Sequence, residues 1–203
     1  MSTLRRMFGR SRKEIWRQLS DEIAARYIEG TFWQGDKVQA KHKDWIVTLD
    51  TYVVSAGKTV IVYTRMRAPY VNPDGFRFTV YRKGIFSGIA KKLGMQDIEI
   101  GDEPFDRDFI IKANDEGRAR QLLLHTRVRE LLARQPEIHL SVKDDEGWFG
   151  TQFPEGVDEL YFVSVGVIKD IERLKLLFEL FSEALDQLCR MGAAYTQPPD
   201  VAL

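Results

Sequence analysis

The sequence has 203 residues and a single cysteine, Cys189, so no disulfide can form within one chain. A cysteine-rich metal site is excluded for the same reason, and the composition fits a reducing compartment. No apolar run approaches the roughly 20 residues that a membrane-spanning helix needs. The N-terminus also lacks the apolar core of a secretory signal. We therefore expect a cytoplasmic protein, with a peripheral membrane location as the alternative.

Net charge is also absent, because 30 Lys and Arg residues balance 30 Asp and Glu residues. Such a chain has no overall attraction for nucleic acid or an anionic membrane, and we expect no nucleic-acid partner. The local basic stretches are residues 1–13, a predicted flexible arm with Arg5 and Arg6, and a segment with Arg82, Lys83, Lys91 and Lys92. They are candidates for contact with an anionic membrane surface. The alternative is a solvated terminus and a short helix over residues 84–93 that covers the protein's own core.

Motifs of common catalytic and cofactor sites are missing. No GxGxxG follows a strand, and no P-loop, GxSxG or HExxH occurs. His42, His125 and His139 are far apart in the sequence, and Cys189 follows Leu188 near the end of a helical pattern, which is typical of a buried thiol. We therefore predict no metal and no cofactor, and we favour a protein without catalytic activity.

One acidic cluster keeps an enzymatic alternative open. It comprises Asp97, Glu99, Asp102, Glu103, Asp106 and Asp108. Paired carboxylates can serve as general acid and base, so a carboxylate-dependent hydrolase is the alternative function. The ordinary interpretation is a solvated edge formed by two strands, at 97–100 and 108–112, around an acidic turn.

Among the features that are present, an amphipathic pattern at residues 170–191 is the longest. Its apolar residues recur at steps of three and four: Ile171, Leu174, Leu177, Phe178, Phe181, Ala184, Leu185 and Leu188. Asp170 is a suitable N-cap and Gly192 a suitable residue to end the helix. A second helix is predicted over residues 11–29, where Ser11 and Glu14 have the spacing of a capping box.

Alternating apolar residues before residue 82 predict antiparallel strands with one buried face. That face would carry Trp45, Val47, Leu49, Phe76, Phe78 and Val80. The opposite face would carry Tyr63, Arg65, Arg77 and Tyr81, which mix stacking surface with positive charge. These four residues are the predicted ligand-binding site.

The later chain contains a predicted helix pair with caps at Asn114 and Thr126, then strands near 138–142 and 160–165. Because the strands come in clusters, the pattern favours an α+β fold: an antiparallel meander sheet with an N-terminal helix, a central helix pair and a long C-terminal helix packed on the sheet. We predict one domain over residues 14–192, with a candidate sub-boundary near 94–101, and a loose tail at 193–203.

The segment Phe105-Asp106-Arg107-Asp108-Phe109-Ile110-Ile111-Lys112-Ala113-Asn114-Asp115 reads FDRxFIIKxND. Together with the following helix pair, strand and late helix, it resembles an uncharacterised family of bacterial proteins, over about Gly75 to Arg190. The resemblance implies a bacterial origin and brings no activity, cofactor or catalytic residue.

These patterns favour a non-catalytic binding or interaction protein, whose partner would be another protein or a small ligand. A long helix over a curved sheet can enclose an apolar pocket, and a small apolar ligand between helix and sheet is one form of this hypothesis. Binding to a membrane surface through the basic stretches is another alternative.

Overall fold

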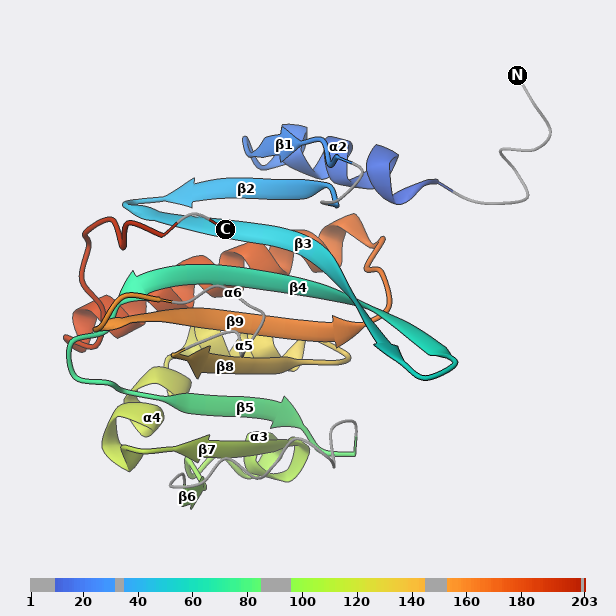
Figure 1. Cartoon of the computed structure of the whole chain (residues 1–203). Helices are drawn as coiled ribbons and strands as arrows, with labels where there is room; N and C mark the ends of the chain where they lie inside the picture. Colours follow the sequence, from blue (N-terminus) through green and yellow to red (C-terminus); the bar gives the residue numbers. More distant parts are fainter. Residues whose placement is uncertain (1–9, 32–34, 85–95, 145–152, 202) are drawn as a thin grey trace.

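The computed structural model describes residues 10–31, 35–84, 96–144, 153–201 and 203. Within these ranges the chain forms one antiparallel sheet in the order β1-β2-β3-β4-β9-β8-β5-β7-β6 (Figure 1). Its strands are β1 (Arg26–Ile28), β2 (Lys37–His42), β3 (Trp45–Ala56), β4 (Thr59–Val71), β5 (Phe78–Arg82), β6 (Gln96–Ile98), β7 (Phe109–Ala113), β8 (His139–Lys143) and β9 (Val157–Val165).

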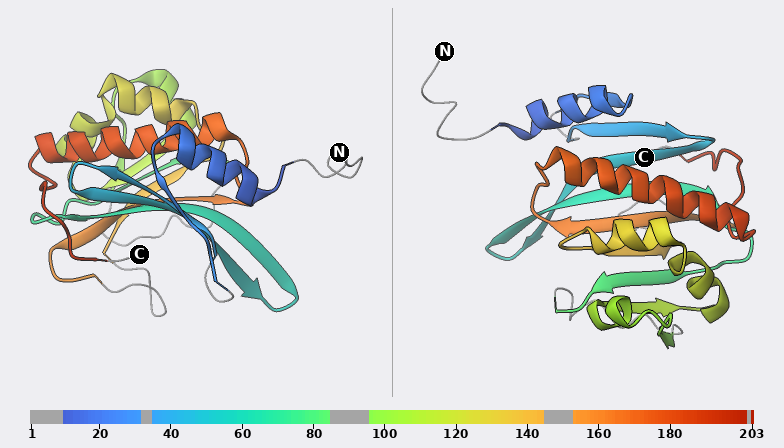
Figure 2. Two further views of the ribbon diagram at one scale, coloured as in Figure 1. Left: turned by 90° about the horizontal axis from the view of Figure 1, so that it is seen from above. Right: turned by 180° about the vertical axis from the view of Figure 1, so that it is seen from behind.

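All described helices lie on the same face of this sheet (Figure 2). They are α2 (Arg12–Glu22), α3 (Glu103–Asp108), α4 (Glu116–Leu123), α5 (Thr126–Ala133) and α6 (Ile171–Arg190). Helix α6 is the centre of this layer, since α2, α4 and α5 all contact it. The predicted α+β class, with a helix pair and a long C-terminal helix on an antiparallel sheet, is confirmed.

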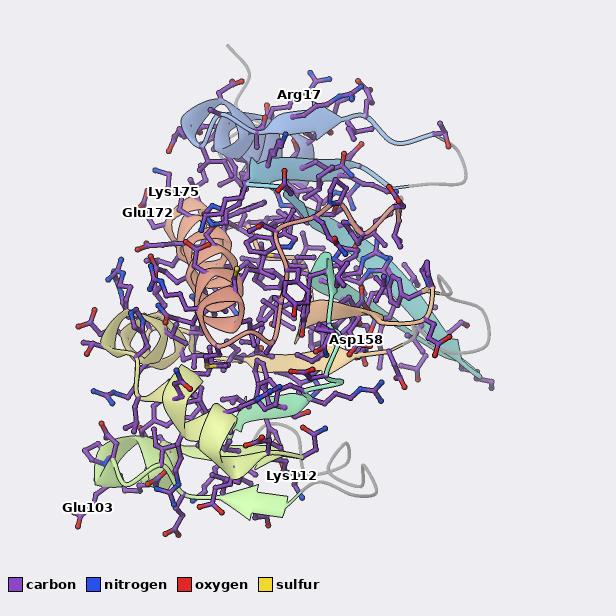
Figure 3. The ribbon with its side chains drawn as sticks, turned by 90° about the vertical axis from the view of Figure 1, so that its left-hand side faces the viewer. Arg17, Glu103, Lys112, Asp158, Glu172 and Lys175 are labelled. Atoms are coloured by element: carbon purple, nitrogen blue, oxygen red, sulfur yellow. The ribbon has the colours of Figure 1, made fainter. Side chains whose placement is uncertain are left out.

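Helix α6 buries the predicted stripe except at Ile171, which is partly buried. Its residues Leu174, Leu177, Phe181, Ala184, Leu185 and Leu188 have no exposed surface. The carboxylate of Asp170 caps the first turn by accepting from the Arg173 N–H at 3.1 Å, and Gly192 follows the helix with φ of 72°. Glu172 and Lys175 are labelled on the outer side of α6 in Figure 3. Charged residues thus stay in water while the apolar stripe packs on the sheet.

Side chains of each strand alternate between two faces. The face beneath the helices, called the apolar face below, carries Val47, Leu49, Met66, Ala68, Phe78, Val80, Ile111, Leu140, Leu160 and Phe162, all in the core. The six residues predicted to line the buried face are all at most 2% exposed. The alternation therefore predicted correctly which side of β3 and β5 packs beneath the helices.

The strand order differs from a simple meander. The sequence pattern places residues 76–81 next to residues 60–66, whereas β9 and β8 lie between β4 and β5. The predicted turn exists, and Asn72 organises it: its Nδ2 donates to the Phe76 carbonyl at 2.9 Å and to Asp158 at 2.6 Å. The last contact fastens the turn to β9. Alternation determines the face that a strand buries but not its neighbour in the sheet.

The acidic segment contains a helix that the pattern did not predict. Between β6 and β7 the chain forms α3, where the sequence predicts a turn. The Asp102 carboxylate accepts from the Phe105 N–H at 3.1 Å and so caps this helix, and a proline occupies its first turn. Pro104 lacks the N–H that a first turn leaves unused, so it favours a helix start here.

The helix pair is present, with both caps one residue from the predicted positions. Helix α4 is capped by Asp115, whose side chain accepts from the Arg118 N–H, and α5 is preceded by His125. Asn114 instead donates from its side chain to the Gly75 carbonyl. The predicted helix at 84–93 lies outside the described residues, apart from Gly84.

Candidate polar face and cavity

The face of the sheet opposite the helices carries a row of polar side chains that crosses all the described strands. Cross-strand register aligns Arg26, Gln39, Thr48, Arg67, Tyr161, Ser141, Thr79, Lys112 and Asp97. This surface is called the polar face below. Much of it is nevertheless buried: Arg67 is 3% exposed and Ser141 is 1% exposed. Burying polar groups is costly unless they are paired, so their partners decide what this face can do.

A carboxylate shared by two arginines lies on the polar face where β3 and β4 pair. Asp50 of β3 accepts from Arg65 Nε at 2.7 Å and from Arg67 Nη2 at 2.6 Å. Asp50 is 4% exposed, and the pair with Arg67 is buried on both sides. Such a pair holds the strands in one register, because removing either partner leaves a buried charge.

Stacked aromatic rings extend this cluster. The rings of Tyr52 and Tyr63 lie 5.0 Å apart and nearly parallel. The guanidinium of Arg65 sits 5.1 Å from the Tyr52 ring. The Arg65 side chain is therefore held both by a carboxylate and by a ring, which makes this part of β3 and β4 rigid.

Tyr161 of β9 lies beside the cluster and stays protonated. Burial, followed by the neighbouring Tyr52, raises the pKa of Tyr161 well above its ordinary value. The ammonium of Lys143 sits 3.2 Å from the centre of its ring. A neutral phenol in this position can act as a hydrogen-bonding group but not as an anion at physiological pH.

The four predicted ligand-binding residues do not form one cluster. Tyr63 and Arg65 belong to β4 and Tyr81 to β5, with β9 and β8 between these strands. Tyr81 packs edge-on against His139 with ring centres 6.0 Å apart. Arg77, just before β5, pairs with Asp144 at 2.7 Å. The structure thus divides the predicted site into two pairs.

A cavity of about 620 Å³ lies at one end of the polar face, between the sheet and the C-terminal segment. Gln39 of β2, Ile46 and Thr48 of β3 and Pro69 of β4 form its floor. Pro198, Pro199, Val201 and Leu203 form its opposite wall. Figure 2 shows the C-terminal segment crossing to the side of the sheet away from the helices.

Two contacts attach the C-terminal segment to the sheet. The indole N–H of Trp45 donates to the Tyr195 carbonyl at 3.2 Å, and the Tyr195 N–H donates to the Val71 carbonyl at 3.2 Å. Ala193 and Ala194 just before them are fully buried. Residues 193–203, predicted as a loose tail, are thus in contact with the sheet at their start and line the cavity further on.

Sequence reasoning did not find this cavity. Ile46 alternates with Trp45 and Val47, which places it on the polar face, and it is 48% exposed. Two features of the sequence could have indicated the cavity. One is an apolar residue at a solvated strand position, and the other is the apolar end of the chain, with Pro198, Pro199, Val201 and Leu203. The pocket that the pattern allowed between the long helix and the sheet is a different place, where a smaller cavity of about 270 Å³ lies among Ile23 and residues of β2, β3 and α6.

Asp97, Asp102, Asp106 and Asp108, four of the six acidic residues that suggested a hydrolase, have structural partners. Asp106 accepts from the N–H groups of Ile100 and Gly101, both at 2.9 Å. Asp102 caps α3, and Asp97 pairs with Lys112 at 3.0 Å. Neither the 620 Å³ cavity nor a smaller one between α2, β2 and α6 includes any of the clustered carboxylates.

The basic candidates for an anionic surface are only partly described. Arg82 donates to the carbonyls of Ala133 and Gln135, and its guanidinium lies 4.6 Å from the Phe109 ring. Lys83 donates to the Asp106 carbonyl at 2.9 Å. Arg5, Arg6, Lys91 and Lys92 lie outside the described residues.

The histidines are dispersed, as their spacing indicates. His42 lies 2.8 Å from Asp186 of α6, His125 precedes α5, and His139 is buried on the polar face. Among the residues that the structure describes, no group of three or more His, Cys, Asp or Glu side chains could hold a metal ion. No described helix is long and apolar enough to span a membrane.

Comparison with known proteins gives one informative likeness. No protein-family model and no curated protein matches the chain. A crystal structure of the mycobacterial trehalose monomycolate transport factor A, TtfA, is similar in fold, with a TM-score of 0.53 and 10% sequence identity. The likeness covers 96% of this chain and 100% of that one. It shows that the architecture described above also occurs there.

Proposed function

We propose that this chain is a binding protein that holds a small, mainly apolar molecule in the cavity beneath its C-terminal segment. The observation that carries the proposal is the cavity itself. Its volume of about 620 Å³ falls within the range of about 300–1,000 Å³ typical of small-molecule sites. Its apolar lining comprises Ile28, Ile46, Pro69, Pro198, Pro199, Val201 and Leu203.

The polar groups of the lining indicate what kind of ligand fits. Gln39 Nε2 donates to Thr48 Oγ1 at 3.2 Å, so amide and hydroxyl groups meet on the floor. The lining has one lysine, Lys37, beside the carboxylates Glu29, Asp44 and Asp200. Since these charges do not favour an anion, we expect a neutral molecule that has an apolar body and one or a few hydrogen-bonding groups.

The similar structure is named as a transport factor for trehalose monomycolate. At 10% identity that name supports no more than a compatible fold, so the cavity remains the basis of the proposal. Binding, rather than turnover, is proposed because none of the clustered carboxylates lines the cavity, and Asp97, Asp102 and Asp106 are engaged in an ion pair, a cap and a turn.

A titration with Nile red, an uncharged dye that fluoresces in apolar surroundings, tests the proposal. We expect saturable binding at one site. Ile46→Asp, which places a charge on the cavity floor, should weaken binding at least about tenfold, because a carboxylate would have to lose water there. The matched control is Val165→Asp, a change at an equally exposed valine (53%) on β9 that does not line the cavity.

The C-terminal wall provides a second variant. A chain that ends at Gln197 lacks Pro198, Pro199, Val201 and Leu203 and should bind Nile red as weakly as Ile46→Asp. Circular dichroism would confirm that each variant folds. Binding that Ile46→Asp and the truncation leave unchanged, or that Val165→Asp weakens equally, would contradict the proposal.

A further inference from the structure

The hairpin of β3 and β4 extends beyond the rest of the sheet. Register pairs β2 with β3 only as far as Leu49, and β9 with β4 only from Thr64. Beyond these positions β3 and β4 pair with each other as far as Ala56 and Thr59. Figure 1 shows this two-stranded ribbon projecting past the end of β9. We call residues 52–63 the ribbon.

The two edges of the ribbon are not equivalent. On the β4 side, the Gly166 N–H donates to the Val62 carbonyl at 2.7 Å, and Gly166 forms a bridge with Tyr63. On the β3 side, among the residues that the structure describes, no strand pairs with residues 52–56. The outer edge of β3 therefore offers backbone N–H and C=O groups for pairing.

This edge has an unusual composition for an exposed strand. Residues 51–56 read Thr-Tyr-Val-Val-Ser-Ala and carry no charge. Val53 is 59% exposed and Val54 is 39% exposed. Exposed edges of soluble proteins are normally protected by lysine, proline or a bulge, and Lys58 in the turn is the one charge in the ribbon. An unprotected apolar edge indicates a surface that becomes covered.

The base of the ribbon is rigid enough to present this edge in one geometry. The Tyr52 and Tyr63 rings stack at 5.0 Å across the two strands. The Arg65 guanidinium covers Tyr52 and is fixed by Asp50. A strand held in place before association loses less entropy when it pairs.

We propose that the outer edge of β3 joins two copies of this chain, so that their sheets become continuous across a twofold axis. A second copy is the occupant that the sequence of this edge fits. In an antiparallel pair whose twofold axis passes between the two copies of Val53, each Val53 lies opposite the second copy's Val53, and each Tyr52 lies opposite the second copy's Val54. Only uncharged residues meet, so no like charges oppose one another. A twofold pair is also closed and does not propagate into a fibre.

Sedimentation equilibrium of the full chain over a range of concentrations tests this proposal. We expect a reversible dimer. Val53→Asp should raise the dimer dissociation constant at least about tenfold, because two carboxylates would then lie opposite each other at the axis. An equimolar mixture of Val53→Asp and Val53→Lys should associate more tightly than either variant alone, since opposite charges then face each other across the axis.

The matched control is Val60→Asp on β4, the other strand of the same ribbon, where the valine is 65% exposed. This variant should dimerise like the original chain. Nile red binding of all variants reports that the cavity and fold persist, so failure here is distinct from failure of the ligand proposal. A chain that is monomeric at every concentration would overturn the dimer. So would a dimer that Val53→Asp does not weaken, or that Val60→Asp weakens equally.

Discussion

The two faces of the sheet use burial in opposite ways. On the apolar face, Leu49, Met66 and Phe162 pack under α6 with no exposed surface and no polar group to satisfy. On the polar face, Asp50 and Arg67 are buried almost as deeply, and there charge pairing stabilises the arrangement. Apolar side chains pack without directional partners. Buried charged side chains need a partner at hydrogen-bond distance, and this requirement fixes the register of the strands that carry them. The comparison places the apolar core on one face and the cavity of about 620 Å³ on the other.

The largest expected effect is the loss of packing on the apolar face. Phe181→Ala should lower the free energy of unfolding by about 3–5 kcal/mol, the usual cost of truncating a fully buried phenylalanine. Chemical denaturation monitored by circular dichroism would measure this. The control is Glu172→Ala on the same helix, whose side chain is 78% exposed and which should change stability by less than about 1 kcal/mol. Equal effects of the two variants would refute the packing of α6 on the sheet.

A comparable change on the polar face should act through charge instead of volume. Asp50→Asn removes the carboxylate that pairs with Arg65 and Arg67 and leaves two arginines close together. We expect a loss of about 3 kcal/mol, as for other buried pairs that lose one partner. Arg65→Met/Arg67→Met/Asp50→Leu, which removes all three charges, should recover part of this loss. If the triple variant is less stable than Asp50→Asn, the cost is not that of unpaired charge.

A smaller effect depends on pH and concerns Asp158, the acid that fastens the Asn72 turn to β9. Burial raises the pKa of Asp158 above its ordinary value of 3.8, against the lowering effects of Asn72 and Arg77. The folded chain therefore keeps this proton at a pH where the unfolded chain has lost it. Stability from this group falls as pH rises through the window between 3.8 and the raised pKa.

The variant Asp158→Asn removes this titration. Its stability relative to the original chain should be least favourable at low pH and should improve as pH rises through that window. Urea denaturation at a series of pH values would measure the difference. A difference that is constant with pH, or that changes in the opposite direction, would contradict a raised pKa.

The smallest expected effect is a change in the rate at which a thiol reagent modifies Cys189. This residue is partly buried and packs against the core near the end of α6. A thiol reagent should modify the folded chain several times more slowly than the chain in urea, because access requires local opening. Equal rates in the two states would mean that the end of α6 is open to solvent.

Much of the apolar face could be predicted from the sequence. Periodicity and caps predicted α6, and alternation predicted the buried side of β3 and β5, because both patterns are local and repeat along the chain. The acidic segment was harder, since Asp102 and Pro104 start a helix only six residues long. A helix this short has too few residues for a periodic signal.

The polar face was less accessible to prediction because it depends on which strands are neighbours. Tyr63 and Tyr81 were assigned to the same side, yet β9 and β8 separate them. Asp50 and Arg67 could be paired only when the register of β3 and β4 was known. The cavity is lined by both Ile46 and Leu203. These residues are far apart in the sequence, and no local pattern predicts that they lie close together.

The central claim is that the ligand site lies on the polar side of the sheet and not in the core beneath the helices. Isotope labelling of isoleucine methyl groups tests it in one titration with Nile red, followed by nuclear magnetic resonance. Ile28 and Ile46 line the cavity, while Ile111 and Ile138 are buried on the helix side. We predict that the signals of Ile28 and Ile46 shift to saturation while those of Ile111 and Ile138 stay in place. Shifts confined to Ile111 and Ile138 would contradict the account and place the ligand between helices and sheet.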